Sequence, residues 1–330
     1  MSASRTISIK ETNMTSVTEQ VIRDQFPYLR QALETPIPQV EGGTLVFVGC
    51  GTSFYLARAL AGVANSLGRA AIAVPGAEWT SYPRSHLADE TGAIVIGLSR
   101  SGTTTETVAA IHASRERGLK TIAISCEPGS TILEAAETGL HLATDPREGI
   151  VMSVSATLML IGGLRLIGAL VDEADIAAAE AALNELDAGA GVIEGRNHFV
   201  FLGAGALYGI ACEGALKLME MSINPAQAFH PMEFRHGPIS LIDGGSLLVQ
   251  LYSAATAKEE AVLTSELQAK GARVIGFGGP GDLAIGQASD KPAAALRVLP
   301  ALQLLGEKVA LARNINTETP RHLTKVVVLN

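Results

Sequence analysis

The chain has 330 residues, of which 47% are hydrophobic and 18% charged, and its formal net charge is −8 at pH 7. This length exceeds the usual single domain, so two domains with cores of their own are expected. The acidic balance argues against a general surface for nucleic acids or anionic membranes, so any bound anion must be held by local groups. We therefore expect neither nucleic acid nor a membrane among the partners.

Cysteine usage and the N-terminal sequence indicate the compartment. Cys50, Cys126 and Cys212 are widely spaced in apolar stretches and match no metal-binding or disulfide pattern. The N-terminal residues lack the apolar core of a signal peptide. The longest apolar stretch, residues 150–171, is interrupted by two serines and an arginine, which indicates a buried helix and not a membrane span. These features predict a cytoplasmic protein with reduced cysteines and no bound metal.

Apolar runs of strand length alternate with helical patterns through the first half of the chain. A helix is expected within residues 16–33, ahead of the first strand. Strands are predicted within GTLVFVGCGTS (43–53), AAIAVPG (70–76), GAIVIGLSRSG (92–102), KTIAISCEPGS (120–130) and GLHLATD (139–145). This alternation predicts βαβ units that form a parallel sheet through right-handed crossovers.

The same pattern then restarts. FVGCGTSFYLARAL (47–60) and FLGAGALYGIACEGAL (201–216) share an apolar strand, two glycines, an aromatic residue and a helical continuation. Further strands are predicted in GGSLLVQLYS (244–253), ARVIGFGG (272–279) and ALRVLP (295–300). We therefore predict an α/β protein with two similar doubly wound halves. The predicted divisions are a helical segment 1–40, a first domain 41–175, a helical connection 176–195, a second domain 196–315 and a C-terminal tail 316–330.

The sequence GCGTS, from Gly49 to Ser53, predicts a strand-to-helix turn. Glycines let a ligand approach the main chain, and a helix N-terminus attracts an anion. The third glycine of the dinucleotide-binding fingerprint is missing, and the chain has no GxxxxGK[ST] phosphate loop. On its own the motif fits a tight turn without a ligand equally well.

Residues 97–110, GLSRSGTTTETVAA, place six hydroxyl side chains directly after a buried strand. Open α/β sheets bind ligands beyond the carboxyl ends of their strands. Hydroxyls, main-chain N–H groups and a helix N-terminus together can hold a phosphate monoester. The simpler role is that Thr103 caps the helix in a capping box with Glu106, and we expect both roles.

A charged cluster interrupts the apolar helix EGALKLMEMS (213–222). Glu213, Lys217 and Glu220 are spaced so that all three share one helix face. A buried carboxylate is costly unless it is paired or used. The alternatives are a surface stripe of ion pairs and a general base whose basicity Lys217 tunes.

For other polar residues, the neighbouring sequence gives weaker evidence of a function. His236, in MEFRHGP, stands beside a Gly–Pro turn that suits proton transfer, whereas His230 and His322 are weaker candidates. Ser153, at the start of an apolar helix, fits close helix packing as well as a ligand role. Lys325 precedes an apolar terminal run and matters only if the tail folds over a site.

Six motifs, in the same order, resemble the sugar isomerase (SIS) family: GCGTS, SRSGTTTET, VMSVS, ALKLMEMS, EFRHGP and TPRHLTKVVVL. The resemblance covers nearly the whole chain. It is strongest to the isomerase half of glutamine:fructose-6-phosphate amidotransferase and to stand-alone glucosamine-6-phosphate deaminases. It implies two tandem SIS domains, each a five-stranded parallel sheet between helices in a flavodoxin-like, three-layer arrangement. It also implies a homodimer with the active site near the subunit interface.

The resemblance implies roles for individual residues by position. The sugar phosphate would be held by Ser99, Arg100, Ser101 and Thr104. The sugar would face Thr52, Ser53 and Ser153. The catalytic residues would be Glu220 as the base between C1 and C2, Lys217 beside it, His236 in ring opening across the dimer interface, and Lys325 as the imine-forming amine.

Two positions depart from the amidotransferase pattern, which has Gln in place of Arg100 and Lys in place of Ser155. No cysteine precedes Cys50, so we expect no ammonia production from glutamine and a reaction that releases ammonia. The resemblance thus implies that glucosamine 6-phosphate is converted to fructose 6-phosphate and ammonia, without a metal or redox cofactor. Alternatives are a related enzyme acting on galactosamine 6-phosphate or a fructosamine-type 6-phosphate, a plain aldose–ketose isomerase, and a non-catalytic sugar-phosphate sensor.

Overall fold

The computed structural model describes residues 15–327, and in this part of the chain ten strands form two five-stranded parallel sheets. The strand order is β2-β1-β3-β4-β5 in the first sheet and β10-β9-β8-β6-β7 in the second. The second order repeats the first, because β6 to β10 take the places of β1 to β5. The predicted α/β class and the five-stranded parallel sheets are therefore confirmed.

The first half of the chain contains one complete sheet. Its strands are β1 (Leu45–Gly49), β2 (Ala71–Pro75), β3 (Ile94–Ser99), β4 (Lys120–Ser125) and β5 (Thr138–His141). Its helices are α1 (Val17–Arg23), α2 (Phe26–Glu34), α3 (Thr52–Ser66), α4 (Gly76–Ser81), α5 (Pro83–His86), α6 (Thr105–Glu116), α7 (Thr131–Ala135) and α8 (Val154–Leu166).

The second half contains the other sheet. Its strands are β6 (His198–Gly203), β7 (Ala226–Phe229), β8 (Ser246–Leu251), β9 (Arg273–Phe277) and β10 (Leu283–Ile285). Its helices are α9 (Glu173–Ala188), α10 (Leu207–Ser222), α11 (Pro231–Phe234), α12 (Ala257–Ala269) and α13 (Ala294–Leu311), with short 3-10 turns at Ala190–Ile193 and Pro238–Leu241.

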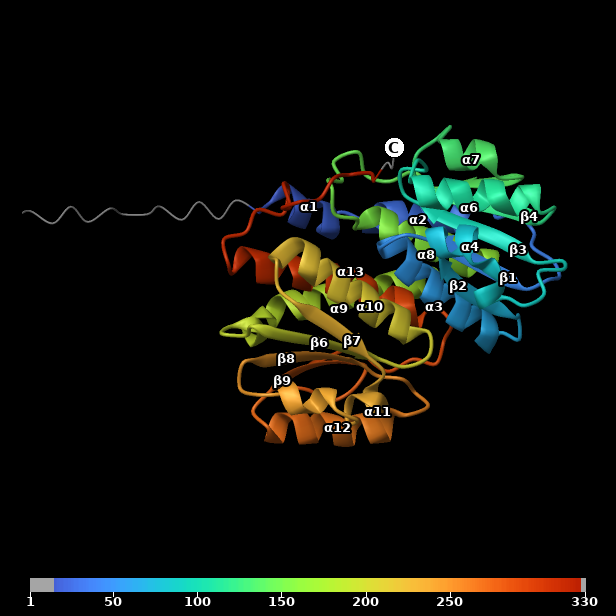
Figure 1. Ribbon diagram of the computed structural model, residues 1–330. Coiled ribbons are helices and arrows are strands. Elements are labelled where there is room, and N and C mark those ends of the chain that lie inside the picture. Colours follow the sequence, from blue (N-terminus) through green and yellow to red (C-terminus); the bar gives the residue numbers. More distant parts are fainter. Residues whose placement is uncertain (1–14, 328–330) are drawn as a thin grey trace, which may run out of the picture.

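Helices cover both faces of each sheet (Figure 1). The outer face of the first sheet packs against α4, α6 and α7, where Trp79 and Ile111 are fully buried. The outer face of the second packs against α11 and α12 through Phe234 and Leu263. Helices α3, α8, α9, α10 and α13 lie between the two sheets (Figure 1).

The apolar residues between the sheets form one continuous core. It includes Leu45 and Phe47 of β1, Phe199 and Phe201 of β6, and Leu302 of α13. Burial of aliphatic and aromatic surface is the main stabilising contribution to such a layer. The two halves therefore share a core in addition to the smaller clusters on their outer faces.

Helices α3 and α10 cross at two glycines. A Cβ atom on Gly209 would lie 2.4 Å from the main-chain nitrogen of Ala59, and one on Gly62 would lie 2.9 Å from the Cα of Ala206. No side chain fits at either position, so the helix backbones are in direct contact. This contact brings α10, from the second half, against the start of α3 in the first.

Two predicted elements differ from the structure, and two strands of the second sheet were not predicted. ALRVLP was predicted as a strand but lies inside helix α13, where the apolar residues continue at helical spacing past Pro300. The sheet is completed instead by β7 and β10, whose four and three residues are too few to give a clear alternating pattern. The single helix expected within 16–33 is two helices, α1 and α2, because Pro27 in the first turn of α2 cannot continue a helix from α1.

The capping box predicted at α6 is also wrong. The helix begins at Thr105 with Thr104 as its N-cap, and no side-chain cap bond is present. The hydroxyl of Thr103 instead donates to Ser101 Oγ at 3.1 Å. Two hydroxyls of the loop are thus used to shape the loop itself.

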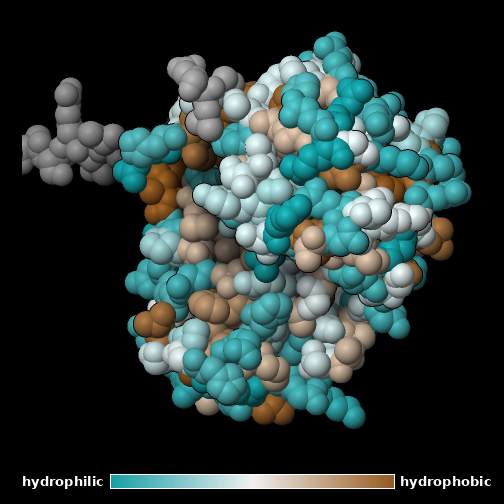
Figure 2. Space-filling view, turned by 45° about the vertical axis from the view of Figure 1, so that its right-hand side comes forward, coloured by the Kyte–Doolittle hydropathy of each residue, from teal (hydrophilic) through white to brown (hydrophobic). Residues whose placement is uncertain are grey.

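The surface and the cysteines show no specialised feature. On the face in Figure 2, hydrophobic side chains occur in small scattered groups among hydrophilic ones. No helix within residues 15–327 is both long and apolar enough to cross a bilayer. All three thiols are free, and Cys126 and Cys212 are buried.

Candidate active site

A cavity of about 210 Å³ lies at the carboxyl edge of the first sheet. Its walls come from the turn after β1, the loop after β3, the segment before α8, helix α10 and the C-terminal segment, residues 316–327. Of the predicted residues, the cavity is lined by Thr52, Ser53, Arg100, Ser101, Thr104, Lys217, Glu220 and Lys325. Ser99, Ser153 and His236 do not line it.

The loop after β3 is held in a tight conformation by its own hydroxyls. Ser99 is buried, accepts a hydrogen bond from the N–H of Gly102 at 3.1 Å, and donates to Thr104 Oγ1 at 3.3 Å. Gly102 has a positive φ of 64°, and a Cβ there would lie 2.1 Å from Ser130 Oγ. Ser99 therefore shapes the loop, whereas Ser101 and Thr104 face the cavity beside the N-terminus of α6.

Arg100 crosses from this loop to two other segments. Its side chain is buried, with Nη1 donating to the carbonyl oxygen of Gly149 at 3.0 Å and Nη2 donating to that of Lys325 at 2.9 Å. Its Nε atom is buried and has no hydrogen-bond partner among the described residues. Burial lowers the pKa of Arg100, which nonetheless stays charged because a guanidinium starts from a very high value.

Helix α10 contributes the charged cluster predicted from its spacing. Lys217 is only 1% exposed, and its ammonium donates to Glu220 Oε2 and lies 3.6 Å from Glu213 Oε1. The side chain of Glu213 is fully buried, while that of Glu220 is 21% exposed and reaches the cavity. The prediction of a shared face is confirmed, and the face points inward.

Burial changes the proton affinities within this cluster. Loss of hydration raises the pKa of Glu213 to about 7, and the nearby ammonium of Lys217 only partly offsets this. Burial alone would lower the pKa of Lys217, but the two carboxyl groups outweigh it and the pKa is raised. The cluster therefore combines a lysine held in its charged form with a carboxyl that titrates near neutral pH, which suits proton transfer.

The turn after β1 joins this cluster to the first half. Thr52 Oγ1 donates to Glu213 Oε1 at 3.1 Å, so this hydroxyl is occupied by a carboxyl group. The other oxygen of Glu213, Oε2, is buried without a partner among the described residues. Ser53 lies beside Thr52 in the first turn of α3 and also lines the cavity.

Ser153 is buried just behind the cavity. Its N–H and hydroxyl donate to Glu148 Oε1 at 2.6 and 3.1 Å, and the N–H of Ser155 donates to the same oxygen at 3.1 Å. The carboxylate of Glu148 thus binds the N-terminus of α8, where free N–H groups attract negative charge. The Ser153 hydroxyl, which was predicted to face the sugar, is thus already bonded to Glu148.

The C-terminal segment leaves α13 and crosses to the first half of the chain (Figure 1). Lys325 lies at the cavity, and its Nζ donates to the carbonyl oxygen of Glu148 at 3.2 Å. His236 is different, because it follows α11 in the second half and is exposed to solvent. The structure therefore brings Lys325, but not His236, to the charged cluster of its own chain.

Comparison with known families identifies the architecture. The SIS domain model matches residues 40–164 and 193–294, and each matched segment contains all or nearly all of one sheet. The chain belongs to the SIS domain family. The match agrees with the resemblance carried by the six sequence motifs.

Individual SIS proteins are similar over most of this chain. A glutamine–fructose-6-phosphate aminotransferase (isomerizing) from Pyrobaculum aerophilum is 30% identical over 309 residues, which cover 86% of this chain and 51% of that protein. The chain spans about half the length of the curated relatives it matches. The structure of a glucosamine-6-phosphate deaminase from Thermotoga maritima superimposes with a TM-score of 0.82 at 29% identity, covering 95% of this chain and 100% of that one.

A third SIS structure agrees in fold. Tagatose-6-phosphate ketose/aldose isomerase from Escherichia coli has a TM-score of 0.78 and 23% identity, with 96% of both chains covered. At this identity the likeness concerns the fold alone.

Sequence reasoning missed three groups around the cavity. Glu213 was placed on the correct helix face but given no role of its own. Glu106 lines the cavity with a buried Oε2 that lacks a partner among the described residues, and Glu148 supports both Ser153 and Lys325. The SIS motifs contain no signal for Glu148, because its contacts depend on how a loop returns to the start of α8.

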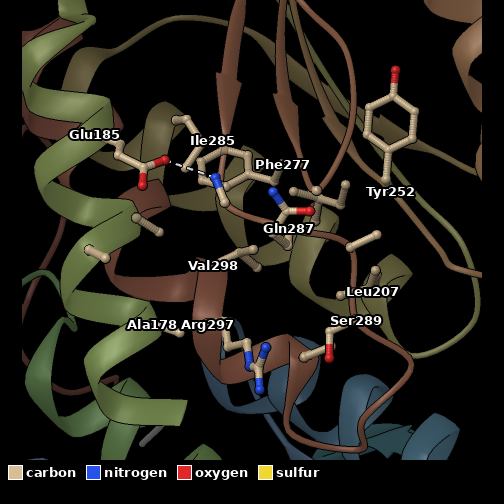
Figure 3. Close-up of a pocket in the computed structure, with 17 residues that line it drawn as sticks. Ala178, Glu185, Leu207, Tyr252, Phe277, Ile285, Gln287, Ser289, Arg297 and Val298 are labelled. Atoms are coloured by element: carbon tan, nitrogen blue, oxygen red, sulfur yellow. Dashed lines mark hydrogen bonds between the residues drawn. The ribbon is translucent and has the colours of Figure 1, made fainter. Parts of the chain in front are cut away.

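A second pocket, of about 300 Å³, opens at the carboxyl edge of the second sheet (Figure 3). By the repeat and the strand registers, Leu207 stands where Ser53 stands in the first half, and Tyr252 where Ser99 stands. At these two positions the serines of the first half are thus replaced by larger side chains, and Phe277 and Val298 add apolar surface.

The charged groups of this second pocket are already paired. Arg297 Nη2 donates to Asp175 Oδ1 at 2.6 Å, and Glu185 accepts the N–H of Gly286 at 2.8 Å, the bond dashed in Figure 3. No cluster of three or more metal-binding side chains occurs within residues 15–327. The hydroxyl-rich loop and the lysine–glutamate cluster described above thus lie at the cavity of the first sheet and not at this pocket.

Proposed function

We propose that this protein is an amino-sugar-phosphate deaminase that converts glucosamine 6-phosphate and water into fructose 6-phosphate and ammonia. The observation that carries the proposal is the meeting, in one cavity, of a hydroxyl-rich loop at a helix N-terminus with the Lys217–Glu220 pair. The first feature suits a phosphate and the second suits proton transfer. The name of the Thermotoga maritima relative supports the same reaction.

The phosphate would be held by the loop after β3. Ser101 and Thr104 supply hydroxyls, α6 supplies its N-terminal N–H groups, and Ser99 keeps the loop in shape. Arg100 adds positive charge to a protein whose net charge is −8, so the anion is attracted locally. The sugar would then extend towards α10, with Thr52 and Ser53 beside it and Ser153 behind.

The central step moves a proton between neighbouring carbons. In the open-chain aldose, Glu220 removes the proton from C2 and returns it to C1, while a second proton passes from the C2 amine to O1, so that C1 becomes a CH₂OH group and C2 an imine. Lys217 holds this carboxyl group in place through its ammonium. A base fixed beside the reacting carbons accelerates such a transfer through both proximity and protonation state.

Release of ammonia follows from the imine. Water adds to C2, the C2–N bond breaks, and the nitrogen leaves as ammonia with a ketone at C2. Lys325 can enter the same sequence, since its amine adds to C2, displaces ammonia and forms a lysine imine that water then hydrolyses. Both routes consume one water and give fructose 6-phosphate, and no electrons are transferred.

We further propose that the protein acts as a homodimer of two-domain chains. His236 is exposed and outside its own chain's cavity, so it can assist ring opening only where a second copy presents it. The repeated strand order supports two tandem, flavodoxin-like SIS domains, at 41–175 and 196–315, that follow a helical segment 1–40 and are joined by residues 176–195. Residues 316–330 would act as a tail over the active site.

The test is to incubate the purified protein with glucosamine 6-phosphate and to measure ammonia and fructose 6-phosphate together. We expect equal amounts of both products, and a loss of about 10²-fold or more in kcat for Glu220→Gln. Glu116→Gln, at the exposed end of α6, is the matched control and should keep full activity.

Failure to form either product above the Glu220→Gln background would refute the deaminase proposal. Galactosamine 6-phosphate, assayed in parallel, tests the alternative substrate. Turnover of that sugar alone would keep the reaction but reassign its substrate.

A further inference from the structure

Arg100 makes contacts that it would not need if its only role were to bind a phosphate. Two of its donor groups point to main-chain carbonyl oxygens, Nη1 to Gly149 at 3.0 Å and Nη2 to Lys325 at 2.9 Å. These acceptors lie on two different segments, one of them 225 residues further along the chain. A planar guanidinium can bridge two such acceptors at once, which an ammonium on a flexible stem cannot do.

The same two segments also meet through Lys325 itself. Its Nζ donates to the carbonyl oxygen of Glu148, the neighbour of Gly149, at 3.2 Å. Lys325 is therefore fixed at two points. Its carbonyl oxygen accepts a hydrogen bond from Arg100, and its amine donates to the loop at Glu148 and Gly149, which Arg100 also contacts. This arrangement fixes the direction in which the amine enters the cavity.

Few other hydrogen bonds hold the end of the described chain. Residues 321–327 form no helix or strand, and Lys325 is exposed. Within these residues the remaining hydrogen bonds are local, from the Leu323 N–H to the Pro320 carbonyl and from Thr324 Oγ1 to the Val326 carbonyl. The two bonds at Lys325 are thus the hydrogen bonds that join residues 321–327 to other described segments.

We propose that Arg100 is a positioning residue that holds the C-terminal segment over the cavity and thereby fixes the amine of Lys325. Its buried Nε, which has no partner among the described residues, stays available to an oxygen of a bound phosphate. The role of Lys325 in turnover rests on the proposed function, whereas the hold on the segment does not. Arg100 would thus join the phosphate end of the site to the amine end.

The first test measures how firmly the segment is held. Trypsin cleavage after Lys325 in the folded protein, followed by mass spectrometry, reports local opening. We expect cleavage to be about 10- to 100-fold faster in Arg100→Gln and Arg100→Lys, because both lose hydrogen bonds from a charged donor. Arg117→Gln, which removes an arginine paired with Glu90 elsewhere in the same half, should match the wild type.

The second test separates this role from phosphate binding. We expect Arg100→Lys to bind inorganic phosphate within about threefold of wild type by calorimetry while its kcat falls, since the charge is kept and the bridge is lost. If Arg100 served only to bind phosphate, Arg100→Lys would show the opposite pattern: a raised KM, weaker phosphate binding and unchanged trypsin cleavage. That pattern would overturn the proposal.

Two safeguards keep the result interpretable. Thermal unfolding shows whether each variant is folded, and Arg100→Lys decides the matter if Arg100→Gln does not fold. The cleavage and phosphate measurements need no turnover, so they remain decisive if the protein fails to act on glucosamine 6-phosphate. Unchanged cleavage in a folded Arg100→Lys would overturn the inference whatever the substrate is.

Discussion

Lys217 is the side chain on which the electrostatics of the cavity depend, because its ammonium lies between two carboxyl groups of unequal exposure. Glu220 is partly exposed and reaches the cavity, whereas Glu213 is fully buried. One cation cannot fully compensate two carboxyl groups, so the more buried carboxyl gains affinity for a proton. The cluster thus separates a carboxyl group that faces the cavity from one behind it that can store a proton.

This separation predicts a pH dependence of stability for Glu213. Its pKa of about 7 lies above its ordinary value of 4.5, so between these values the folded state keeps a proton that the unfolded chain has released. The contribution of Glu213 to stability is therefore present below pH 4.5 and lost as the pH rises to 7. Relative to Glu213→Gln, the wild-type free energy of unfolding should fall by at most about 1.4 kcal/mol per pH unit in this window.

Urea denaturation of both proteins at several pH values between 4.5 and 8 provides the measurement. Glu116→Gln, a change of the same kind at an exposed position, should follow the wild type at every pH. If the wild-type and Glu213→Gln curves run parallel across the window, Glu213 does not titrate there and the assignment is wrong.

For single residues, the sequence predicted which side chains share a helix face better than it predicted what surrounds them. The positions of Glu213, Lys217 and Glu220 on one face follow from helix geometry, and the structure confirms them. Burial of that face and the bond from Thr52 could not be read from spacing, because they depend on which helix packs opposite. Glu148 was missed for the same reason, since its partners meet it only through the fold.

At the scale of elements, the crossing of α3 and α10 determines where the charged groups of the cavity stand. The contact at Gly62 and Gly209 brings α10 close enough for Glu213 to accept a hydrogen bond from Thr52 at the start of α3. A wider separation would leave the turn after β1 and the charged cluster on opposite sides of a gap. The two glycines are therefore part of the site, although neither touches the cavity.

Gly209→Ala should destabilise the protein by about 1–3 kcal/mol, because the new methyl group would overlap the backbone of α3. At an uncrowded helix position the same change stabilises by up to about 1 kcal/mol, so the sign of the effect is informative. Urea denaturation measures it. Gly191→Ala, where the nearest atom is 4.0 Å away, should change stability little. An equally stable or more stable Gly209→Ala protein would contradict the close crossing.

Elements with long periodic patterns were predicted well, and short ones were not. The buried helix expected in residues 150–171 is α8, and the strands with continuous apolar runs all appear. β10 has three residues and could not be distinguished from a loop. ALRVLP was misread because six residues without their continuation fit a strand as well as a helix, and the pattern that decides lies further along α13.

At the scale of the whole molecule, a second copy would complete the site by supplying His236. This predicts complementation between two inactive variants, Glu220→Gln and His236→Ala, when they are refolded together. Half of the dimers would be mixed, with one intact site in each, so roughly a quarter of the wild-type activity should return. Ammonia release from the mixture is the measurement.

The control for this experiment is a mixture of Glu220→Gln with Lys325→Ala. Both residues line the cavity of a single chain, so no cavity in a mixed dimer would have both intact, and mixing should give no activity beyond that of the two variants alone. A first mixture that stays as inactive as this control would show that His236 is not supplied by a partner.

The contact of α3 with α10 also bears on how molecules enter and leave. Closure of two lobes around a ligand requires a joint with few packed contacts, and here the main chains touch at the crossing while one core runs through both halves. Rotation of one half against the other would break that packing. If the cavity is the active site, entry and exit would then depend on a short stretch of chain. The timing of product release would be set by residues 316–327 and not by the rigid body beneath them.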